Sequence, residues 1–190
     1  MRRIGILGDI GSGKSYVAKC FGQPVFNADL VVSKIYKKNK NIFKKLKKEL
    51  PGHFHSFPIK KTEIIDVILE NKNNLKKIIK IVHYEVRNEL NLFLKKNKNK
   101  KIVVLDIPLL LENKINKKND ILIFVESKRL EILKRLKKRE NYNAKLLKNF
   151  KKIQLPLDLK IKKSQFIIKN NFNQNSVKIK VKKILKILNK

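Results

Sequence analysis

The most informative shortages in this chain concern cysteine, tryptophan and acidic residues. Its 190 residues contain one cysteine, no tryptophan, and 15 aspartates and glutamates against 48 lysines and arginines. A single thiol, at Cys20, excludes an internal disulfide, as in cytoplasmic proteins, and we expect it to pack in the core. No apolar run approaches the ~20 residues of a membrane span, and Asp9 interrupts the apolar stretch after Arg2 and Arg3. We therefore expect a cytoplasmic protein with neither a membrane span nor a signal peptide.

The shortage of acids leaves the chain with a formal net charge of +33 at pH 7. Nucleic-acid-binding proteins carry such a surplus as a patch or stripe. Here the lysines are spread along the whole chain among asparagines and isoleucines, and there is no RNP-type aromatic motif or zinc-finger spacing. We interpret the charge as a compositional bias on the surface of an ordinary enzyme and expect no specific nucleic-acid partner. A surface that binds polyanions is the alternative.

Glycine is scarce too, but three of the six glycines fall between positions 8 and 13. Residues 8–15 read Gly-Asp-Ile-Gly-Ser-Gly-Lys-Ser, which is the complete G-x-x-x-x-G-K-[ST] motif of a phosphate-binding loop. Its glycines let successive backbone N–H groups turn toward a phosphate chain. Its lysine reaches the β- and γ-phosphates, and its last hydroxyl ligates Mg²⁺. The residues expected to bind a nucleotide are Gly11, Ser12, Gly13, Lys14, Ser15 and Tyr16.

Continuous apolar runs alternate with helix-forming stretches along the chain. Runs of this length suit strands that are buried on both faces, as in a parallel sheet. The predicted strands are 3–7, 24–26, 101–105, 121–125 and 166–168. The predicted helices are one after the phosphate motif, at 16–21, and then 30–49, 62–70, 72–97, 128–138, 143–154 and 174–189. The alternation predicts an α/β fold with a doubly wound, mainly parallel five-stranded sheet of P-loop NTPase type. Ligands bind such sheets beyond the carboxyl ends of the strands.

Two aspartates stand where predicted strands end. Asp29 follows the second strand, where its carboxylate can take a proton from an attacking hydroxyl or orient a water on Mg²⁺; capping the next helix is an equal alternative. Asp106 follows four apolar residues, the pattern of a Walker-B strand whose carboxylate holds the metal, although aspartate is also common in turns after strands. The leucines of Pro108–Glu112 either line an acceptor pocket or pack in the core.

Two pairs of basic residues have helical spacing. Arg135 and Arg139 are four residues apart, as are His83 and Arg87, so the members of each pair share a face on a helix. Arginine is scarce among the many lysines, and its planar guanidinium matches phosphate oxygens, which favours a phosphoryl clamp over solvated charge for Arg135 and Arg139. For His83 and Arg87, a contact with phosphate or carboxylate and an exposed polar stripe are both open.

Together these segments resemble the dephospho-coenzyme A kinase family, the P-loop enzymes of the last step of coenzyme A synthesis. The resemblance runs from Ile4 to about Asn170 in the family's order and spacing. The matching segments are Gly8–Ser15, Asn27–Asp29, Ile81–Tyr84 with Arg87, Pro108–Glu112, Arg135–Arg139, Gln154–Lys160 and Ser164–Asn170. The chain departs from the family pattern at Asp9, which replaces a glycine, Asn27, which replaces an acid, Tyr84, which replaces a proline, and Gln165 and Lys169, which replace two acids.

The resemblance implies transfer of the γ-phosphate of ATP to the ribose 3′-hydroxyl of dephospho-CoA, with Mg²⁺ as cofactor. The implied catalytic residues are Lys14, Asp29 as the base, Arg135 and Arg139. The expected metal ligands are Ser15, from the phosphate motif, and Asp106, from the Walker-B pattern of its strand. The implied substrate-binding residues are Asp29, His83, Arg87, Pro108, Leu109, Leu110 and Glu112. We expect residues 1–190 to form one kinase domain, with a helical acceptor region at about 30–95 and a lid at about 128–160, that works as a monomer or weak homo-oligomer without a membrane partner.

Two other functions stay open at this point. The helical region that selects the acceptor is the weakest part of the resemblance, so the chain can be another small P-loop kinase that acts on a nucleoside or nucleotide. The surplus of positive charge suggests, with less support, a P-loop ATPase that binds nucleic acid.

Overall fold

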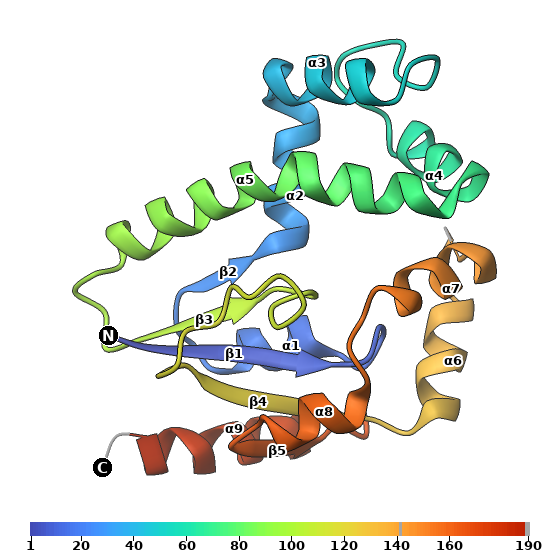
Figure 1. Ribbon diagram of the computed structural model, residues 1–190. Coiled ribbons are helices and arrows are strands. Elements are labelled where there is room, and N and C mark those ends of the chain that lie inside the picture. The colour runs from blue at the N-terminus through green and yellow to red at the C-terminus, as the bar shows by residue number, and fades with distance from the viewer. Residues whose placement is uncertain (141, 189–190) are drawn as a thin grey trace. The chain divides into compact units, whose positions relative to one another are not determined.

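The computed structural model describes residues 1–140 and 142–188. Within these residues, five parallel strands form one sheet in the order β2-β3-β1-β4-β5 (Figure 1). The strands are β1 (Arg2–Gly8), β2 (Val25–Asn27), β3 (Ile102–Asp106), β4 (Ile121–Glu126) and β5 (Phe166–Lys169). The predicted α/β fold with a five-stranded parallel sheet is confirmed, and the strand that leads into the phosphate motif lies at its centre.

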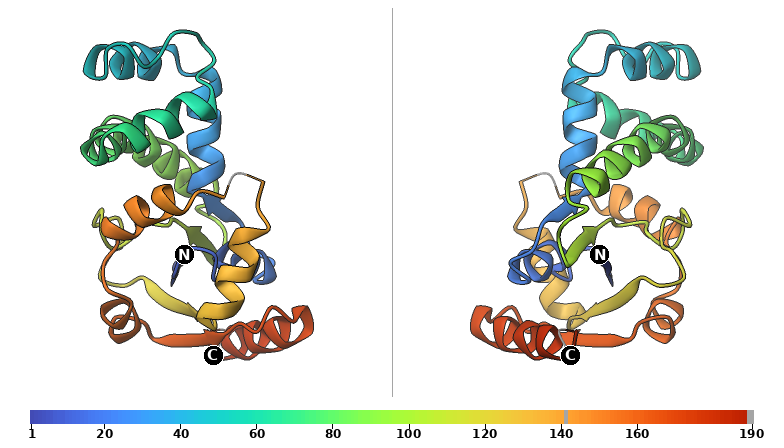
Figure 2. Two further views of the ribbon diagram at one scale, coloured as in Figure 1. Left: turned by 90° about the vertical axis from the view of Figure 1, so that its right-hand side faces the viewer. Right: turned by 90° about the vertical axis from the view of Figure 1, so that its left-hand side faces the viewer.

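The central strands β1, β3 and β4 are mainly apolar and mostly buried because both faces of the sheet are covered there. On one face Ile4 and Ile6 pack with the buried sides of α1 (Lys14–Cys20) and α9 (Gln174–Leu188), and Cys20 packs against this core as predicted. The last of these helices lies beside β5 (Figure 2). On the other face the missing side chain of Gly5 leaves room for Leu110. Alternate residues of β1 therefore pack on opposite faces of the sheet, against α1 and α9 on one face and against Leu110 on the other.

The chain divides into two compact units. The first comprises Met1–Asn27, Lys96–Tyr142 and Gln154–Lys190, and the second comprises Ala28–Lys95 and Asn143–Ile153. The first unit holds the sheet together with α1, α6 (Arg129–Lys137), α8 (Leu157–Lys162) and α9. The second holds α2 (Ala28–Lys38), α3 (Lys40–Glu49), α4 (Lys61–Glu70), nearly all of α5 (Lys72–Lys96), and α7 (Ala144–Lys152). The expectation of one kinase domain with an acceptor region and a lid stays a prediction.

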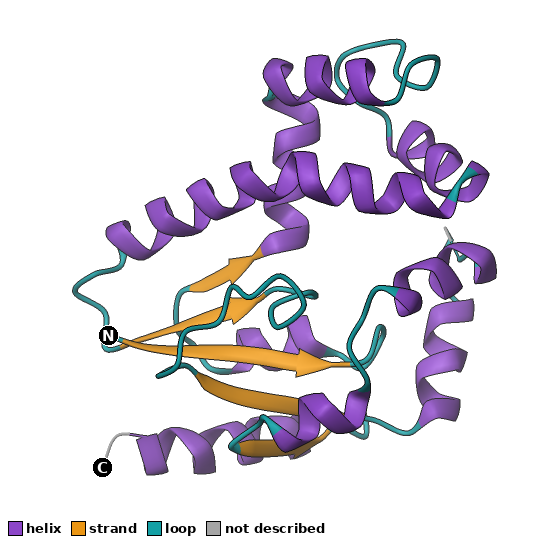
Figure 3. Cartoon of the chain, viewed as in Figure 1, coloured by secondary structure: helices purple, strands orange, loops and turns teal. Residues whose placement is uncertain are grey.

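The second unit is built from helices and loops, and its described residues form no strand (Figure 3). One face of α5 is buried at the helical spacing of Leu75, Ile78, Val82, Val86 and Leu90. The side chain of Asn149 on α7 donates to the carbonyl oxygen of Ile68 on α4 at 3.3 Å, which ties residues far apart in sequence into the same unit. Nowhere in residues 1–140 and 142–188 is a helix both long and apolar enough to span a bilayer.

The structure corrects two helix predictions. The single helix expected at 30–49 is two helices, because Asn39 adopts an extended backbone and its side chain accepts a hydrogen bond from the backbone N–H of Ile42 at 3.0 Å. Asn39 thus ends one helix and caps the next. The short helix α8, which begins after Pro156, was not expected. The predicted end of the last helix, at Asn189, lies outside the described residues.

Candidate active site

The phosphate motif forms a loop between β1 and α1. Gly11 and Gly13 have φ values of 86° and 89°, a region that favours glycine. A Cβ atom at Gly11 would come within 3.0 Å of Ile132 and Leu136 on α6, and one at Gly13 would collide with the side-chain amide of Asn170. Glycine is therefore needed at these positions for two reasons. It tolerates the positive φ, and it leaves room for the side chains of α6 and Asn170 that pack against the loop.

The ammonium group of Lys14 lies over the loop from which it extends. Its Nζ donates to the carbonyl oxygens of Gly8 at 3.3 Å and Asp9 at 2.8 Å. The next residue, Ser15, is exposed. Tyr16 packs against the core beneath the first helix, and its hydroxyl is buried. A cation and a glycine-rich backbone thus meet in one loop, which suits a polyphosphate.

Asp106 ends β3, as predicted, and is almost fully buried. The register of β2 against β3 places Asn27 beside it, and the Asn27 side-chain nitrogen donates to Asp106 Oδ2 at 2.6 Å. An amide at this position can donate to the carboxylate, whereas the acid that the family pattern has there would repel it. The substitution at Asn27 therefore orients the Asp106 side chain at the carboxyl edge of the sheet.

Asp29 is the second residue of α2, the helix that directly follows β2. The helix begins before this residue, so the alternative that Asp29 is its N-cap is wrong. A carboxylate in the first turn is stabilised by the positive end of the helix dipole. The assignment of Asp29 as a base stays a prediction.

The two arginines expected on one helical face are separated by the end of the helix. Arg135 is on α6 and its guanidinium lies over the ring of Phe172, 4.4 Å from the ring centroid. The helix ends at Lys137, and the backbone N–H of Arg139 closes a turn onto the carbonyl oxygen of Leu136 at 3.1 Å. The prediction that these arginines share a face is wrong, because the helix is too short to include Arg139. Their phosphate-binding roles stay predictions.

The segment Pro108–Glu112 divides into core and polar parts. Leu110 is fully buried, which favours the core-packing alternative for this leucine, whereas Pro108 and Leu109 are partly exposed. Glu112 Oε1 accepts hydrogen bonds from Lys160 Nζ at 2.8 Å and from the backbone N–H of residue 155 at 2.9 Å. These two charged side chains are 9% and 1% exposed, so neither can exchange its partner for water. The role expected for Glu112 in binding substrate stays a prediction, and its observed contacts fasten α8 to the turn after β3.

His83 and Arg87 are one turn apart on α5 and in contact, as their spacing predicts. Arg87 Nε donates to His83 Nε2 at 3.4 Å. Burial and, to a smaller extent, the positive charge of Arg87 lower the pKa of His83 from its usual value. The imidazole therefore acts as a neutral acceptor near neutral pH. Tyr84, which replaces the family's proline, is exposed.

The comparisons with known proteins extend over nearly the whole chain. A family model described as dephospho-CoA kinase matches residues 2–176. The chain belongs to the dephospho-CoA kinase family. It is 36% identical to the dephospho-CoA kinase of Wolbachia sp. subsp. Brugia malayi, with 96% of this chain and 95% of that protein aligned. It is 37% identical to the enzyme of the same name from Wolbachia pipientis wMel, with 98% and 97% aligned.

Solved structures support the fold of this dephospho-CoA kinase family member. The crystal structure of TT1252 from Thermus thermophilus superposes with a TM-score of 0.75 at 24% identity and covers 98% of this chain and 97% of that one. A dephospho-CoA kinase from Campylobacter jejuni superposes with a TM-score of 0.64 at 22% identity, with 97% and 96% covered. At these identities the similarity establishes the arrangement of strands and helices.

Two contacts of this kinase were not found from its sequence. Ser127 and Asn170 both donate side-chain hydrogen bonds to the carbonyl oxygen of Ser12, at 3.0 and 2.8 Å. Asn170 is the last residue of the segments that resemble the kinase family. It lies 158 residues from Ser12 in the sequence, so sequence position alone does not indicate that the two are in contact. Nothing in the sequence singled out Ser127 or Phe172.

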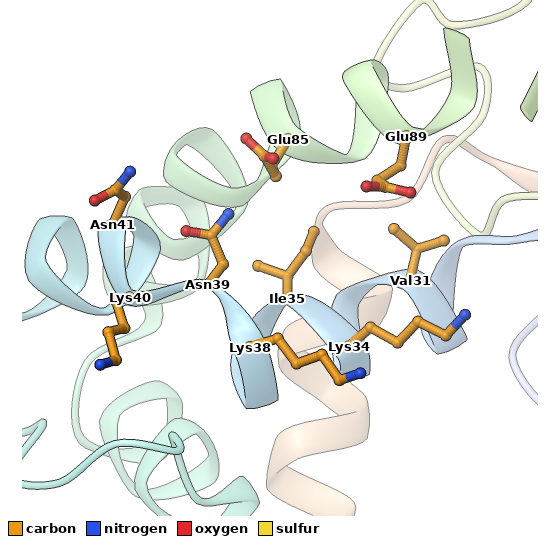
Figure 4. Close-up of a pocket in the computed structure, with 9 residues that line it drawn as sticks. All are labelled: Val31, Lys34, Ile35, Lys38, Asn39, Lys40, Asn41, Glu85 and Glu89. Atoms are coloured by element: carbon orange, nitrogen blue, oxygen red, sulfur yellow. The ribbon is translucent and has the colours of Figure 1, made fainter. Parts of the chain in front are cut away.

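The second unit of this kinase also contains a cavity of about 540 Å³ between helices α2 and α5 (Figure 4). Figure 4 shows Glu85 and Glu89 facing α2 above Val31 and Ile35. The full lining is Val31, Lys34, Ile35, Lys38, Asn39, Lys40, Asn41, Glu85 and Glu89. His83 is two residues from Glu85, which on a helix is a rotation of about 200°. The cavity therefore lies on the other side of α5 from the predicted His83–Arg87 pair.

Proposed function

We propose that this chain transfers the γ-phosphate of ATP to the ribose 3′-hydroxyl of dephospho-CoA, giving ADP and CoA in the last step of coenzyme A synthesis. One observation carries the proposal: the complete phosphate loop, folded between β1 and α1, in a chain that aligns over nearly its whole length with dephospho-CoA kinases. Phosphoryl transfer needs little covalent chemistry from the protein, so positioning and charge stabilisation are the tasks that its residues perform.

In this proposal the loop holds the ATP phosphates. Backbone N–H groups of Gly11–Lys14 surround the β-phosphate, and Lys14 exchanges its contacts with the loop carbonyls for the β- and γ-phosphate oxygens. Arg135 and Arg139 balance the negative charge that spreads over the γ-phosphoryl oxygens in the transition state. Arg135 reaches this position by leaving the Phe172 ring or by keeping one edge on it.

The residues at the edge of the sheet fit Mg²⁺. No group of three or more His, Cys, Asp or Glu side chains suited to a metal occurs in the described residues. Mg²⁺ in kinases needs no such cage, because it takes one or two protein oxygens and completes its shell with phosphates and water. The hydroxyl of Ser15 and the carboxylate of Asp106 would hold it. When bound, the ion neutralises charge on the β- and γ-phosphates.

Asp29 acts on the acceptor. Its carboxylate orients the 3′-hydroxyl of dephospho-CoA and takes the proton as the oxygen attacks. The bond between the 3′-oxygen and the γ-phosphorus forms, the bond from that phosphorus to the β,γ-bridging oxygen breaks, and ADP leaves. His83, Arg87 and, in the segment Pro108–Glu112, the partly exposed Pro108 and Leu109 are proposed to bind the acceptor.

A panel of acceptors tests the function. We expect ADP to form from ATP rapidly with dephospho-CoA, slowly with nucleoside monophosphates, and without stimulation by RNA or DNA. Turnover with a nucleoside monophosphate and none with dephospho-CoA would assign the chain to another kinase reaction. Turnover that requires nucleic acid, with binding that collapses as salt rises, would instead favour the ATPase alternative.

A further inference from the structure

The carbonyl oxygen of Ser12, in the middle of the phosphate loop, is held by two side chains. Ser127 Oγ donates to it at 3.0 Å and Asn170 Nδ2 at 2.8 Å. Ser127 directly follows β4, and Asn170 directly follows β5. Ser12 is fully buried and Asn170 is 4% exposed, so water cannot take the place of the Asn170 amide, whereas Ser127 is partly buried. Two neighbouring strands thus end with donors that converge on one backbone atom.

Asn170 is itself fixed in the orientation that this contact requires. Its backbone N–H donates to the carbonyl oxygen of Glu126 at 2.7 Å, which extends the pairing of β5 with β4 by one residue. Its side-chain oxygen accepts from the backbone N–H of Phe172 at 2.8 Å. Because the oxygen of the amide is used in this way, the NH₂ group faces Ser12.

The orientation of the Ser12 carbonyl determines where the next N–H group points. In a trans peptide the C=O of one residue and the N–H of the next point in opposite directions. Drawing the Ser12 oxygen toward Ser127 and Asn170 therefore turns the N–H of Gly13 away from them. The Asn170 amide also occupies the place of a Cβ on Gly13, so the contact requires glycine there.

We propose that Asn170 and Ser127 are positioning residues for the nucleotide phosphates, which act by fixing the peptide between Ser12 and Gly13 with its N–H toward the phosphate chain. If this peptide turned over, the carbonyl oxygen would face the phosphates and repel them. The inference rests on the proposed ATP site and assigns Asn170 an effect on the phosphates through the loop.

Inorganic tripolyphosphate is the decisive probe, because it fills a phosphate loop and carries no base. Its affinity and that of ATP are measured by calorimetry in about 0.5 M salt, which shortens the reach of the cationic surface to a few ångströms. Binding that survives Lys14→Ala is counted as surface binding. Three variants are compared with the wild type. Asn170→Asp keeps the shape of the side chain but replaces the donor by a charge, and Ser127→Ala removes one of the two donors. Asn175→Ala, at an exposed position on α9, is the control.

We expect Asn170→Asp to weaken tripolyphosphate and ATP alike by about tenfold or more. Ser127→Ala should weaken both by about threefold, in line with the loss of one partly buried hydrogen bond. Asn175→Ala should change neither, and the KM for dephospho-CoA should stay near wild type in all three. Folding is checked by thermal denaturation, and Ser127→Ala carries the test if Asn170→Asp does not fold.

Two results would overturn the inference while leaving the proposed ATP site intact. If Asn170→Asp weakened ATP binding but left tripolyphosphate binding unchanged, Asn170 would act on the base. If Asn170→Asp and Ser127→Ala both left the affinity for the two ligands unchanged, the peptide between Ser12 and Gly13 would not depend on these side chains. Failure of the wild type to bind tripolyphosphate in a Lys14-dependent way would instead remove the ATP site, and the inference with it. The binding measurements do not use the acceptor, so an error about dephospho-CoA does not affect them.

Discussion

At the scale of single residues, the first unit pairs two buried carboxylates, those of Asp106 and Glu112, with specific partners. Asn27 orients Asp106, and Lys160 neutralises Glu112. Such pairs are costly to break, because the remaining group is left without water or partner. From the sequence, Asp106 and Glu112 were expected to bind metal and substrate. Their observed contacts hold the site together.

The proposed base can be tested at one atom. Asp29→Asn keeps the shape of the side chain but cannot take the proton, so we expect kcat to fall about a hundredfold or more while the affinity for ATP changes little. Steady-state kinetics and ATP titration measure the two effects separately. Asp66→Asn, at an exposed position on α4, is the matched control. A kcat near that of the wild type would remove Asp29 from the mechanism.

The Glu112–Lys160 pair predicts a strong, non-additive loss of stability. Lys160→Met leaves a buried carboxylate unpaired, and we expect it to lower the free energy of unfolding by about 3–5 kcal/mol. Lys162→Met, at an exposed position of α8, should cost little. The double variant Glu112→Gln with Lys160→Met should be more stable than the sum of the two single losses. Urea denaturation tests this, and strict additivity would show that the pair is not coupled.

His83 gives a prediction about pH. Burial, with a smaller effect of Arg87, lowers its pKa in the folded state, so the unfolded chain takes up the proton first as the pH falls. His83 therefore contributes stability above its unfolded pKa, near 6.5, and that contribution is lost as the pH falls through the lower folded pKa. NMR titration of the imidazole should give a pKa below the usual value, and Arg87→Ala should raise it only partly, because burial persists. A wild-type pKa at or above the usual value would contradict this.

At the scale of secondary structure, the central strands β1, β3 and β4 could be predicted because they are buried on both faces and form uninterrupted apolar runs. The phosphate loop could also be predicted, because its whole motif lies within eight consecutive residues. The break between α2 and α3 was not predictable, because hydrophobic periodicity continues across Asn39, whose extended backbone ends one helix and whose side chain caps the next. The contacts of Ser12 with Ser127 and Asn170 depend on where strands end in space, which local patterns do not contain.

The break at Asn39 makes a prediction of its own. Asn39→Ala removes the cap of α3, and we expect it to lower the free energy of unfolding by about 1 kcal/mol, whereas Asn39→Asp should keep most of it. Asn41→Ala, at an exposed position inside the same first turn, serves as the control. Chemical denaturation measures the free energy of unfolding of each variant. Equal stability of Asn39→Ala and the wild type would show that the backbone, and not the cap, separates the two helices.

At the scale of the whole molecule, the charge of +33 and the nucleotide site act at different ranges. At physiological salt, charges are screened beyond about 8 Å, so lysines spread over the surface attract polyanions weakly and without selectivity. The phosphate loop binds through directed N–H groups and one ammonium group, which salt affects much less. The enzyme's selectivity is therefore expected to depend on the loop and the acceptor site, and to persist at salt concentrations that abolish binding to RNA.

The mass of the product formed from dephospho-CoA, ATP and Mg²⁺ tests the central claim most directly. We expect one added phosphate on the ribose 3′-oxygen with the wild type, and none with Lys14→Ala under conditions where that variant remains folded. Dephospho-CoA recovered unchanged from an enzyme that still binds ATP would contradict the account.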